Sequence, residues 1–275
     1  MSLTRYTAHR SETVCIHVVH CRPHSHACGP DEYSPVNALA FPLQGMFLKH
    51  HSSRERVVAD SCHAIFFKAG EAYRVSHPVA GGDECLVIAP ARETMQDILC
   101  AEEFAQTHAV LDARLIAAPR ILRHRLLHRM ASGLEAEETA LDLFAASAAA
   151  KPPLSARPRQ RDMVEATKIA LAAQPGEAWS LNALARSVHS SPFHLARTFR
   201  RLAGMPLHRY HLQARLAAAL VEVLDSSREL SAIALDLGFS NHSHFTFTFR
   251  RMFGATPAAL RKEGKILTAE RASAS

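Results

Sequence analysis

The chain has 275 residues, with 32 Lys and Arg against 26 Asp and Glu, which gives a net charge of +6. A composition of 48% hydrophobic and 21% charged residues is globular and excludes a disordered chain. No apolar run approaches the roughly 18 residues of a transmembrane helix, which excludes a membrane protein. Residues 1–10 are polar and lack a secretory signal, so we expect a cytoplasmic protein with reduced cysteines.

The positive charge lies in the second half of the chain. Residues 1–157 carry 16 Lys and Arg against 17 Asp and Glu, whereas residues 158–275 carry 16 against 9. The net charges are therefore −1 and +7. Such an excess in a compact module suits a polyanion such as nucleic acid, although a mildly basic surface is more often simply solvated.

A proline-rich segment, KPPLSARPR, spans residues 151–159. Its three prolines lack a backbone N–H and disfavour helix at the residues that precede them. We predict one domain over residues 1–150, a linker over 151–160 and a second domain over 161–265.

Short runs rich in Val, Ile and Phe, separated by Pro, Gly and Ser, occupy Cys15 to Pro90: VCIHVVH, ALAFPL, CHAIFFKAG and ECLVIAP. This pattern is typical of a β-sandwich or small barrel. From Thr94 to Ala150, Ala, Leu and Arg follow helical spacing and predict two helices with a break near Ser132 and Gly133. The rest of the chain is almost entirely helical in pattern, so the predicted fold class is α+β.

The second domain contains an internal repeat of about 50 residues. In each copy, apolar positions describe two short amphipathic helices separated by a turn. Residues 199–201, Phe-Arg-Arg, align with residues 249–251, and Gly204 aligns with Gly254. A stacked solenoid usually needs three or more copies, so two copies favour a pair of helix-turn-helix units.

The second helix of a helix-turn-helix unit is apolar inside and polar or cationic outside, because its outer face enters the DNA major groove. Leu195 and Phe199 form the predicted inner face in the first copy, as Phe245 and Phe249 do in the second. The helix starts and outer faces supply the predicted DNA-binding residues, which are Ser191, Phe193, His194, Ala196, Arg197, Arg200 and Arg201 in the first copy and Ser240, Asn241, His242, Ser243, His244, Thr246, Phe247, Arg250 and Arg251 in the second.

The arginines are predicted to divide into two roles. Arg197 is the candidate for a bidentate contact to guanine, the commonest specific base contact, with a solvated surface arginine as the alternative. Arg200, Arg201, Arg250 and Arg251 are predicted to bind phosphates.

Two aromatic residues share these faces. Phe193 is predicted either to touch a thymine methyl or to pack on Trp179, and Phe247 cannot donate to guanine and would read thymine methyls or hold the backbone. Ser190 or Ser191, and Ser240, are predicted to cap the second helices.

These residues resemble the C-terminal domain of the AraC/XylS family of transcriptional regulators. The resemblance spans Asp162 to Lys262 and implies two helix-turn-helix units, joined by a helix from about Leu207 to Leu224, in adjacent major grooves. The second copy fits the family pattern at Ile233, Ala234, Gly238, Phe239, Ser243, Phe245, Phe249, Arg250, Phe253, Gly254, Thr256, Pro257 and Arg261.

The first copy departs from the family at one turn. His189 stands where the family often has Gly, as Gly238 does in the second copy. If this residue needs a positive φ, His is tolerated there at a modest cost. On the joining helix, His208 and His211 are expected only to be solvated.

The first domain weakly resembles the cupin-like sensor domains of the same family, through the stretch FFKAGEAYRVSHPVAGGDEC. The resemblance implies a small-molecule effector in the barrel and following helices that pair subunits, which leaves a homodimer open. The resemblance of the C-terminal domain to the AraC/XylS family implies promoter DNA and RNA polymerase as partners. It also implies activation of transcription as the expected outcome, with no enzymatic activity and no obligatory cofactor.

Seven Cys and His residues lie between Cys15 and Cys28. Thiolates and imidazoles are ligands for zinc and other transition metals, and the candidate site comprises Cys21, His24, His26 and Cys28. The spacing matches no CxxC pattern, and buried core cysteines are the alternative. A metal- or thiol-redox-sensing regulator, an alkyl-accepting repair-type regulator and a cupin enzyme with an accessory helical domain stay open as alternative functions.

Overall fold

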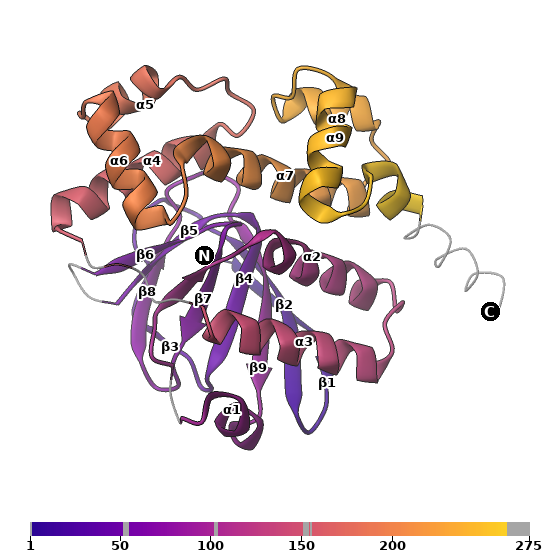
Figure 1. Cartoon of the computed structure of the whole chain (residues 1–275). Helices are drawn as coiled ribbons and strands as arrows, with labels where there is room; N and C mark the ends of the chain where they lie inside the picture. The colour runs from indigo at the N-terminus through magenta and orange to yellow at the C-terminus, as the bar shows by residue number, and fades with distance from the viewer. Residues whose placement is uncertain (1, 52–54, 102–103, 151–153, 155, 263–275) are drawn as a thin grey trace.

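The computed structural model describes residues 2–51, 55–101, 104–150, 154 and 156–262. Strands dominate the part before residue 111, and helices make up nearly all of the part after it. The mixture of strands and helices agrees with the expected α+β class. Figure 1 shows the C-terminal helices resting across one end of the β-structure.

The strands within these ranges form two antiparallel sheets. In spatial order the larger sheet contains β1 (Ser2–Arg10), β2 (Val14–Arg22), β9 (Asp83–Pro90), β4 (Ala38–Gly45), β7 (His63–Phe67) and β10 (His108–Val110). The smaller sheet contains β3 (Glu32–Tyr33), β8 (Ala72–Ser76), β5 (Phe47–His50) and β6 (Arg56–Ala59). The four apolar runs of the sequence form β2, β4, β7 and β9, as predicted.

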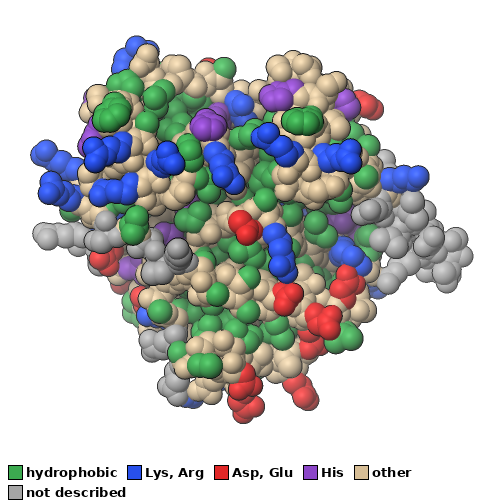
Figure 2. All heavy atoms as spheres, viewed as in Figure 1, with side chains coloured by type: hydrophobic (Ala, Val, Ile, Leu, Met, Phe, Trp, Pro, Cys, Tyr) green, Lys and Arg blue, Asp and Glu red, His purple; other side chains and the backbone are tan. Residues whose placement is uncertain are grey.

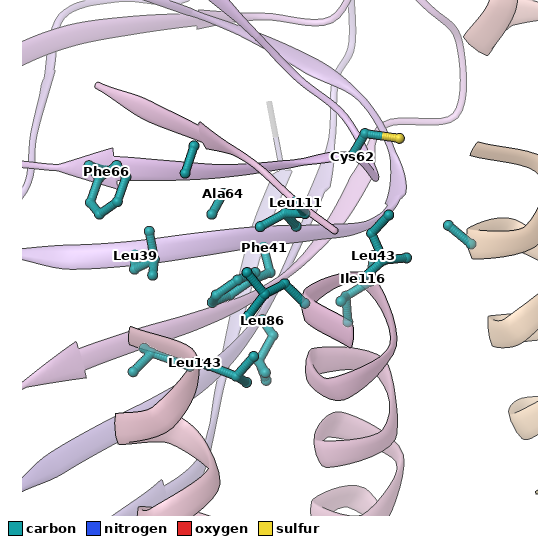
Figure 3. Close-up of a cluster of buried hydrophobic side chains, with 14 of the residues drawn as sticks. Leu39, Phe41, Leu43, Cys62, Ala64, Phe66, Leu86, Leu111, Ile116 and Leu143 are labelled. Atoms are coloured by element: carbon teal, nitrogen blue, oxygen red, sulfur yellow. The ribbon is translucent and has the colours of Figure 1, made fainter. Parts of the chain in front are cut away.

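Two helices, α2 (Ala113–Leu127) and α3 (Gly133–Ala148), cover the outer face of the larger sheet, and α1 (Arg92–Leu99) packs beside α3 at the lower end of the sheet in Figure 1. The break predicted near Ser132 is confirmed, because the Ser132 hydroxyl accepts a hydrogen bond from the Glu135 backbone N–H and caps α3. In Figure 3, Ile116 of α2 and Leu143 of α3 point at Phe41 and Leu86 of the sheet. All four side chains are buried, and their removal from water stabilises the layer.

The remaining helices follow the predicted repeat: α4 (Pro158–Ala173), α5 (Leu181–Ser187), α6 (Pro192–Ala203), α7 (Leu207–Asp225), α8 (Leu230–Asp236) and α9 (His242–Phe253). The joining helix predicted to end near Leu224 is therefore confirmed as α7. Of the predicted linker, residues 151–153 and 155 lie outside the described residues, and α4 begins within it at Pro158, where the missing N–H of proline costs nothing.

Both helix-turn-helix units rest on the first part of the chain. Ala117 of α2 packs against the apolar cluster of α7, α8 and α9. Beneath the first unit, Ile169 of α4 packs against Met46, Leu48 and Val58 of the smaller sheet and its neighbouring loop. None of the described helices combines the length and apolarity needed to cross a membrane.

Candidate nucleic-acid interface and sensor cavity

The first helix-turn-helix unit is built from two capped helices. The Ser180 hydroxyl accepts from the Ala183 backbone N–H to cap α5, and the Ser191 hydroxyl accepts from the His194 N–H, at 3.2 Å, to cap α6. His189 in the turn has φ of +51°, so this position does require the left-handed conformation, and the histidine adopts it.

The second unit is capped by a different residue from the one predicted. The Asn241 side chain accepts from the His244 backbone N–H at 2.8 Å and caps α9. The prediction of Ser240 as the cap is wrong, because the helix starts one residue later and the Ser240 hydroxyl lies 3.2 Å from the His244 ring instead. Gly238 in the turn has φ of +74°, and a Cβ there would lie 2.2 Å from the Gly176 carbonyl oxygen. Only glycine fits that contact.

The inner faces of α6 and α9 are buried as predicted. Leu195, Phe199, Phe245 and Phe249 are fully buried. The predicted DNA-binding residues lie on the opposite faces and at the helix starts. Ala196 and Thr246 are half-buried, and the others are exposed, namely Ser191, Phe193, His194, Arg197, Arg200, Arg201, Ser240, Asn241, His242, Ser243, His244, Phe247, Arg250 and Arg251.

Two large aromatic side chains stand out from these faces. Phe193 is 76% exposed and Phe247 is 65% exposed. The exposure of Phe193 argues against the alternative that it packs on Trp179. Each ring offers an apolar surface among cationic neighbours, and the guanidinium of Arg251 lies 5.8 Å from the centre of the Phe247 ring.

Most of the arginines on the two faces are available to a ligand. Within the described part of the chain, the guanidinium groups of Arg197, Arg200 and Arg250 have no hydrogen-bond or ion-pair partner. Arg201 differs, because it donates to the Gln160 side chain of α4 at 2.6 Å. Figure 2 shows Lys and Arg gathered over the C-terminal helices, with Asp and Glu concentrated over the first part of the chain.

A cavity of about 520 Å³ lies between the two sheets. Its walls are mainly apolar and aromatic, with three acidic groups, the guanidinium of Arg5 and two thiols at intervals. Burial raises the pKa of Tyr73 to about 12 and that of the Cys21 thiol to about 11, so both stay protonated at neutral pH. The lining includes Val19, Val36, Phe47, Phe67, Tyr73, Val75, Val87, Asp31, Glu32, Asp83, Cys21 and Cys85.

The structure does not gather the predicted metal ligands around one point. Cys21 is buried at the end of β2, whereas His24, His26 and Cys28 are exposed. Among the described residues, the groups with ligand atoms within 4.8 Å of one another are Cys21 with His77 and Asp83, and His124 with His128 and Asp225. The strand pairing, which local spacing in the sequence does not reveal, decides which residues Cys21 meets.

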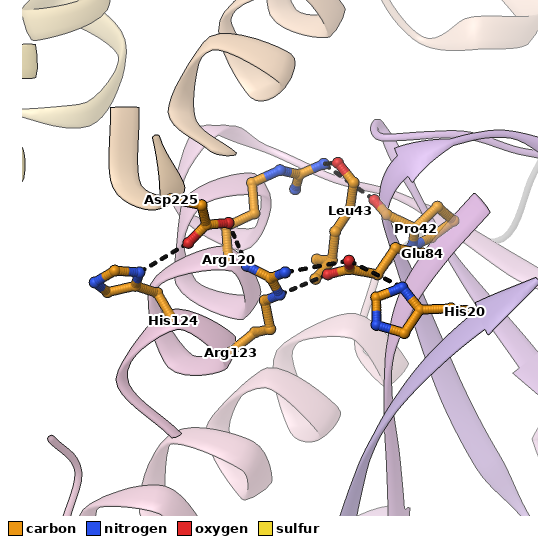
Figure 4. Close-up of polar contacts among 8 residues, drawn as sticks. All are labelled: His20, Pro42, Leu43, Glu84, Arg120, Arg123, His124 and Asp225. Carbon is orange, nitrogen blue, oxygen red and sulfur yellow. Dashed lines mark hydrogen bonds and ion pairs between the residues drawn. The ribbon is translucent and has the colours of Figure 1, made fainter. Parts of the chain in front are cut away.

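A charged network ties the larger sheet to the end of α7 (Figure 4). Arg123 of α2 pairs with Glu84 of β9, with 2.5 Å between Nε and Oε1, and donates to Asp225, the last residue of α7. His124 also reaches Asp225, at 2.9 Å. Next to them, buried Arg120 donates to the carbonyl oxygens of Pro42 and Leu43, at 3.0 Å each.

A second, fully buried network joins the first part to α4 and α7. Asp60 accepts from the Tyr210 hydroxyl and lies 2.7 Å from His63 Nδ1, while Lys168 Nζ lies 2.9 Å from His63 Nε2. Burial alone would raise the pKa of Asp60, but His63, Lys168 and the Tyr210 hydroxyl hold it well below its usual range. Sequence reasoning missed this network, because its members are 3 to 150 residues apart and no local pattern links them.

A protein family described as a helix-turn-helix domain matches residues 184–263. The regulatory protein SoxS of Escherichia coli strain K12 is 34% identical over 82 residues, which are 30% of this chain and 77% of SoxS. The bifunctional transcriptional activator/DNA repair enzyme AdaA of Bacillus subtilis is 33% identical over 90 residues, 33% of this chain and 43% of AdaA.

Among solved structures, an AraC-type transcriptional regulator from Chromobacterium violaceum is similar at 27% identity and a TM-score of 0.37, over 39% of this chain and 96% of that one. The chain thus covers less than half the length of AdaA but three quarters of SoxS. From the duplicated helix-turn-helix units, the match to the helix-turn-helix family and the similarity to SoxS, the chain belongs to the AraC/XylS family of DNA-binding transcriptional regulators.

Proposed function

We propose that this AraC-type regulator inserts α6 and α9 into adjacent major grooves of promoter DNA and controls transcription in response to a small molecule held between its sheets. The observation that carries the proposal is the duplication of a capped helix with an exposed cationic face at the two ends of α7. With 19 residues, α7 is about 28 Å long, close to the roughly 34 Å between successive major grooves on one face of DNA.

The exposed side chains fit distinct roles on the duplex. Arg197 projects from the middle of α6 without a protein partner and suits a guanine edge. Arg200, Arg250 and Arg251 suit phosphates, as do the hydroxyls and backbone N–H groups at the helix starts. Phe193 and Phe247 suit thymine methyl groups. Arg201 is the weakest candidate of the set, because binding phosphate would cost its hydrogen bond to Gln160.

The cavity between the sheets suits an effector with an apolar body and a polar group, since both acidic side chains and Arg5 line it. Phe47, Phe67 and Tyr73 supply apolar and aromatic surface, and Glu32 and Asp83 supply acceptors. We retain the division into a sensor and dimerisation domain over 1–150, a linker over 151–160 and a DNA-binding domain over 161–265 as part of this proposal. Activation, pairing of two copies and contact with RNA polymerase follow from the family resemblance.

The route from the cavity to the DNA-binding part is short. Asp83 and Cys85 of β9 line the cavity, and Glu84 between them belongs to the opposite face of the strand, where it pairs with Arg123. Arg123 in turn holds Asp225 at the end of α7. An effector that moves β9 would therefore change the contacts that position α7 and the second helix-turn-helix unit. Regulation requires such a difference in contacts between the effector-bound and effector-free states.

The test has two arms. Genomic footprinting identifies the bound sites, and a fragment carrying one such site is then titrated with the full-length protein. We expect binding to the site to exceed binding to unrelated DNA of equal length by 10³-fold or more, as is usual for specific regulators. Equal affinity for both fragments would contradict the proposal.

The effector arm uses a cavity-filling variant. Val19→Phe projects a ring into the cavity from β2. A small molecule that shifts DNA binding of the natural protein should lose its effect on this variant, while DNA binding without the molecule persists. An undiminished effect would place the effector elsewhere.

A further inference from the structure

One end of the cavity carries a cluster of metal-ligating side chains that the DNA-binding function does not use. Cys21 of β2 stands directly opposite Asp83 of β9 in the strand register. His77, which follows β8, reaches the same point, and its Nε2 lies 2.6 Å from Asp83 Oδ1. One ligand atom from each of the three residues lies within 4.8 Å of the other two.

The cluster is buried yet open to the cavity. Cys21 and His77 are almost completely buried, and both Cys21 and Asp83 line the cavity. The Cys85 thiol, on the same strand and also in the cavity wall, donates to Asp83 Oδ2 at 3.2 Å. Asp83 is therefore held from two sides, by an imidazole and by a thiol, in the orientation that faces Cys21.

The chemistry of the three groups suits a borderline-soft dication. Sulfur, imidazole nitrogen and carboxylate oxygen are the ligands that zinc uses, and three protein ligands with one open position form a common type of zinc site. Binding of Zn²⁺ would release the proton of the Cys21 thiol to solvent. The resulting thiolate and the Asp83 carboxylate together carry two negative charges, which balance the charge of the ion.

We propose that Cys21, His77 and Asp83 form a binding site for a divalent transition metal such as Zn²⁺, with the fourth coordination position directed into the cavity. The ligand set differs from the one predicted from the sequence, which joined Cys21 to exposed residues of its own loop. Its use as an input to the regulator rests on the proposed function, because only then does an occupied cavity change DNA binding.

The other described group is a weaker candidate. His124, His128 and Asp225 contain no sulfur, and Asp225 is already paired with Arg123, whose positive charge opposes a bound cation. A metal at that position would show only nitrogen and oxygen ligands. Spectroscopy can therefore distinguish the two sites, because only the site with Cys21 would show a metal–sulfur bond.

The experiment titrates Co²⁺ into full-length, chelator-treated protein. We expect one equivalent to bind, with a thiolate-to-cobalt charge-transfer band in the near ultraviolet and visible bands of a tetrahedral site, and Zn²⁺ to displace it. X-ray absorption of the zinc form should show one sulfur in the first shell. A zinc coordination shell that contains no sulfur would overturn the proposal, and this result does not depend on the folding of any variant.

Variants locate the site. Cys21→Ser and His77→Gln should each abolish the charge-transfer band or weaken Co²⁺ binding at least 10-fold. The matched controls are Cys28→Ser and His24→Gln, which should bind as the natural protein does. His26 is left unchanged, because its Nδ1 lies 2.8 Å from the backbone oxygen of His77. Loss of the band in Cys28→Ser with retention in His77→Gln would overturn the assignment in favour of the surface loop. His128→Gln, which affects the sulfur-free group, should leave the band unchanged.

A DNA-binding measurement separates this proposal from the function on which its regulatory role rests. We expect Zn²⁺ to change the affinity of the natural protein for its site and to leave that of His77→Gln unchanged. If the protein binds DNA specifically but binds no metal, or binds it without a sulfur ligand, the metal site is overturned and the proposed function is not. Absence of specific DNA binding in both metal-free and zinc-loaded protein would contradict the proposed function, whatever the metal does.

Discussion

Tyr210, on the helix that joins the two helix-turn-helix units, donates its hydroxyl hydrogen to the carboxylate of Asp60, in the turn between two strands of the first part. Both side chains are buried. Asp60 also accepts from the Cys62 backbone N–H at 2.9 Å, so its position is fixed within its own turn. The hydrogen bond therefore fastens the DNA-binding helices to a rigid point beside the larger sheet.

We expect Tyr210→Phe to lower the free energy of unfolding by about 2 kcal/mol, because a hydrogen bond to a buried charged group is lost while the ring remains. The ring keeps its edge contact with Phe199, at 5.2 Å between centroids. Chemical denaturation monitored by circular dichroism measures the change. Tyr6→Phe, on the exposed strand β1, is the control and should alter stability by less than about 0.5 kcal/mol. Equal values for both variants would refute the role of the hydroxyl.

The pH dependence of stability reports on His211, which the sequence led us to expect in solvent. This expectation is wrong, because α7 buries the side chain, with Nε2 3.0 Å from the Pro175 carbonyl oxygen. Burial and the nearby Arg215 lower the pKa of His211 to about 4. The unfolded chain takes up a proton near pH 6.5, and the folded chain resists it, so the stabilising contribution is complete above pH 6.5 and is lost as the pH falls toward 4.

We therefore expect the free energy of unfolding of the natural protein to decrease between pH 6.5 and 4, and His211→Gln, which can still donate to the carbonyl oxygen, to show a shallower decrease. Denaturation curves at several pH values provide the comparison. His194→Gln, exposed at the start of α6, should retain the slope of the natural protein. Parallel slopes for His211→Gln and the natural protein would show that the buried histidine is not responsible.

The network of Figure 4 predicts coupling between the sheet and α7. Arg123→Met and Glu84→Gln should each destabilise the protein by about 2 kcal/mol, since each breaks the partly buried pair of Arg123 and Glu84. The remaining charge keeps one other partner, which is His20 for Glu84 and Asp225 for Arg123. Because the two substitutions remove the same ion pair, the double variant should cost at least about 1 kcal/mol less than the sum. His20→Asn is the control and should change the stability less than either of these variants, because His20 contacts Glu84 at 3.2 Å from a half-exposed position. Additive effects of Arg123→Met and Glu84→Gln would show that the pair is not coupled.

The arginines of the two recognition helices should separate base reading from backbone binding. We expect Arg197→Ala to weaken binding to the natural site by about 1–3 kcal/mol more than binding to unrelated DNA. Arg251→Ala should weaken both alike and reduce the dependence of log K on log salt by about one unit, because one phosphate contact is lost. Fluorescence anisotropy at four salt concentrations distinguishes them. An equal loss on both DNAs for Arg197→Ala would reassign it to the backbone.

Local sequence signals were sufficient for the helical half. The spacing of Leu195 and Phe199, repeated at Phe245 and Phe249, fixes which faces are buried, since an amphipathic helix buries its apolar stripe wherever it packs. The left-handed turn at His189 could also be anticipated, because it aligns with a glycine in the other copy.

Features that depend on long-range pairing could not be anticipated. Strand β1 carries no apolar alternation and is recognised only because its backbone pairs with β2. The meeting of Cys21 with His77 and Asp83 depends on the register of β2 against β9, and that of Lys168 with His63 on how α4 docks. Nothing within a few residues of any of these positions encodes its partner, so propensity and periodicity leave them undetermined.

Hydroxyl-radical footprinting of the full-length protein on its natural site shows whether α6 and α9 engage the same duplex. If both helices bind, we expect two protected segments centred about 10 base pairs apart on one face of the DNA. Arg197→Ala should then weaken protection of one segment, and Arg250→Ala that of the other. A single protected segment, unaffected by one of the two substitutions, would exclude the binding of both helices.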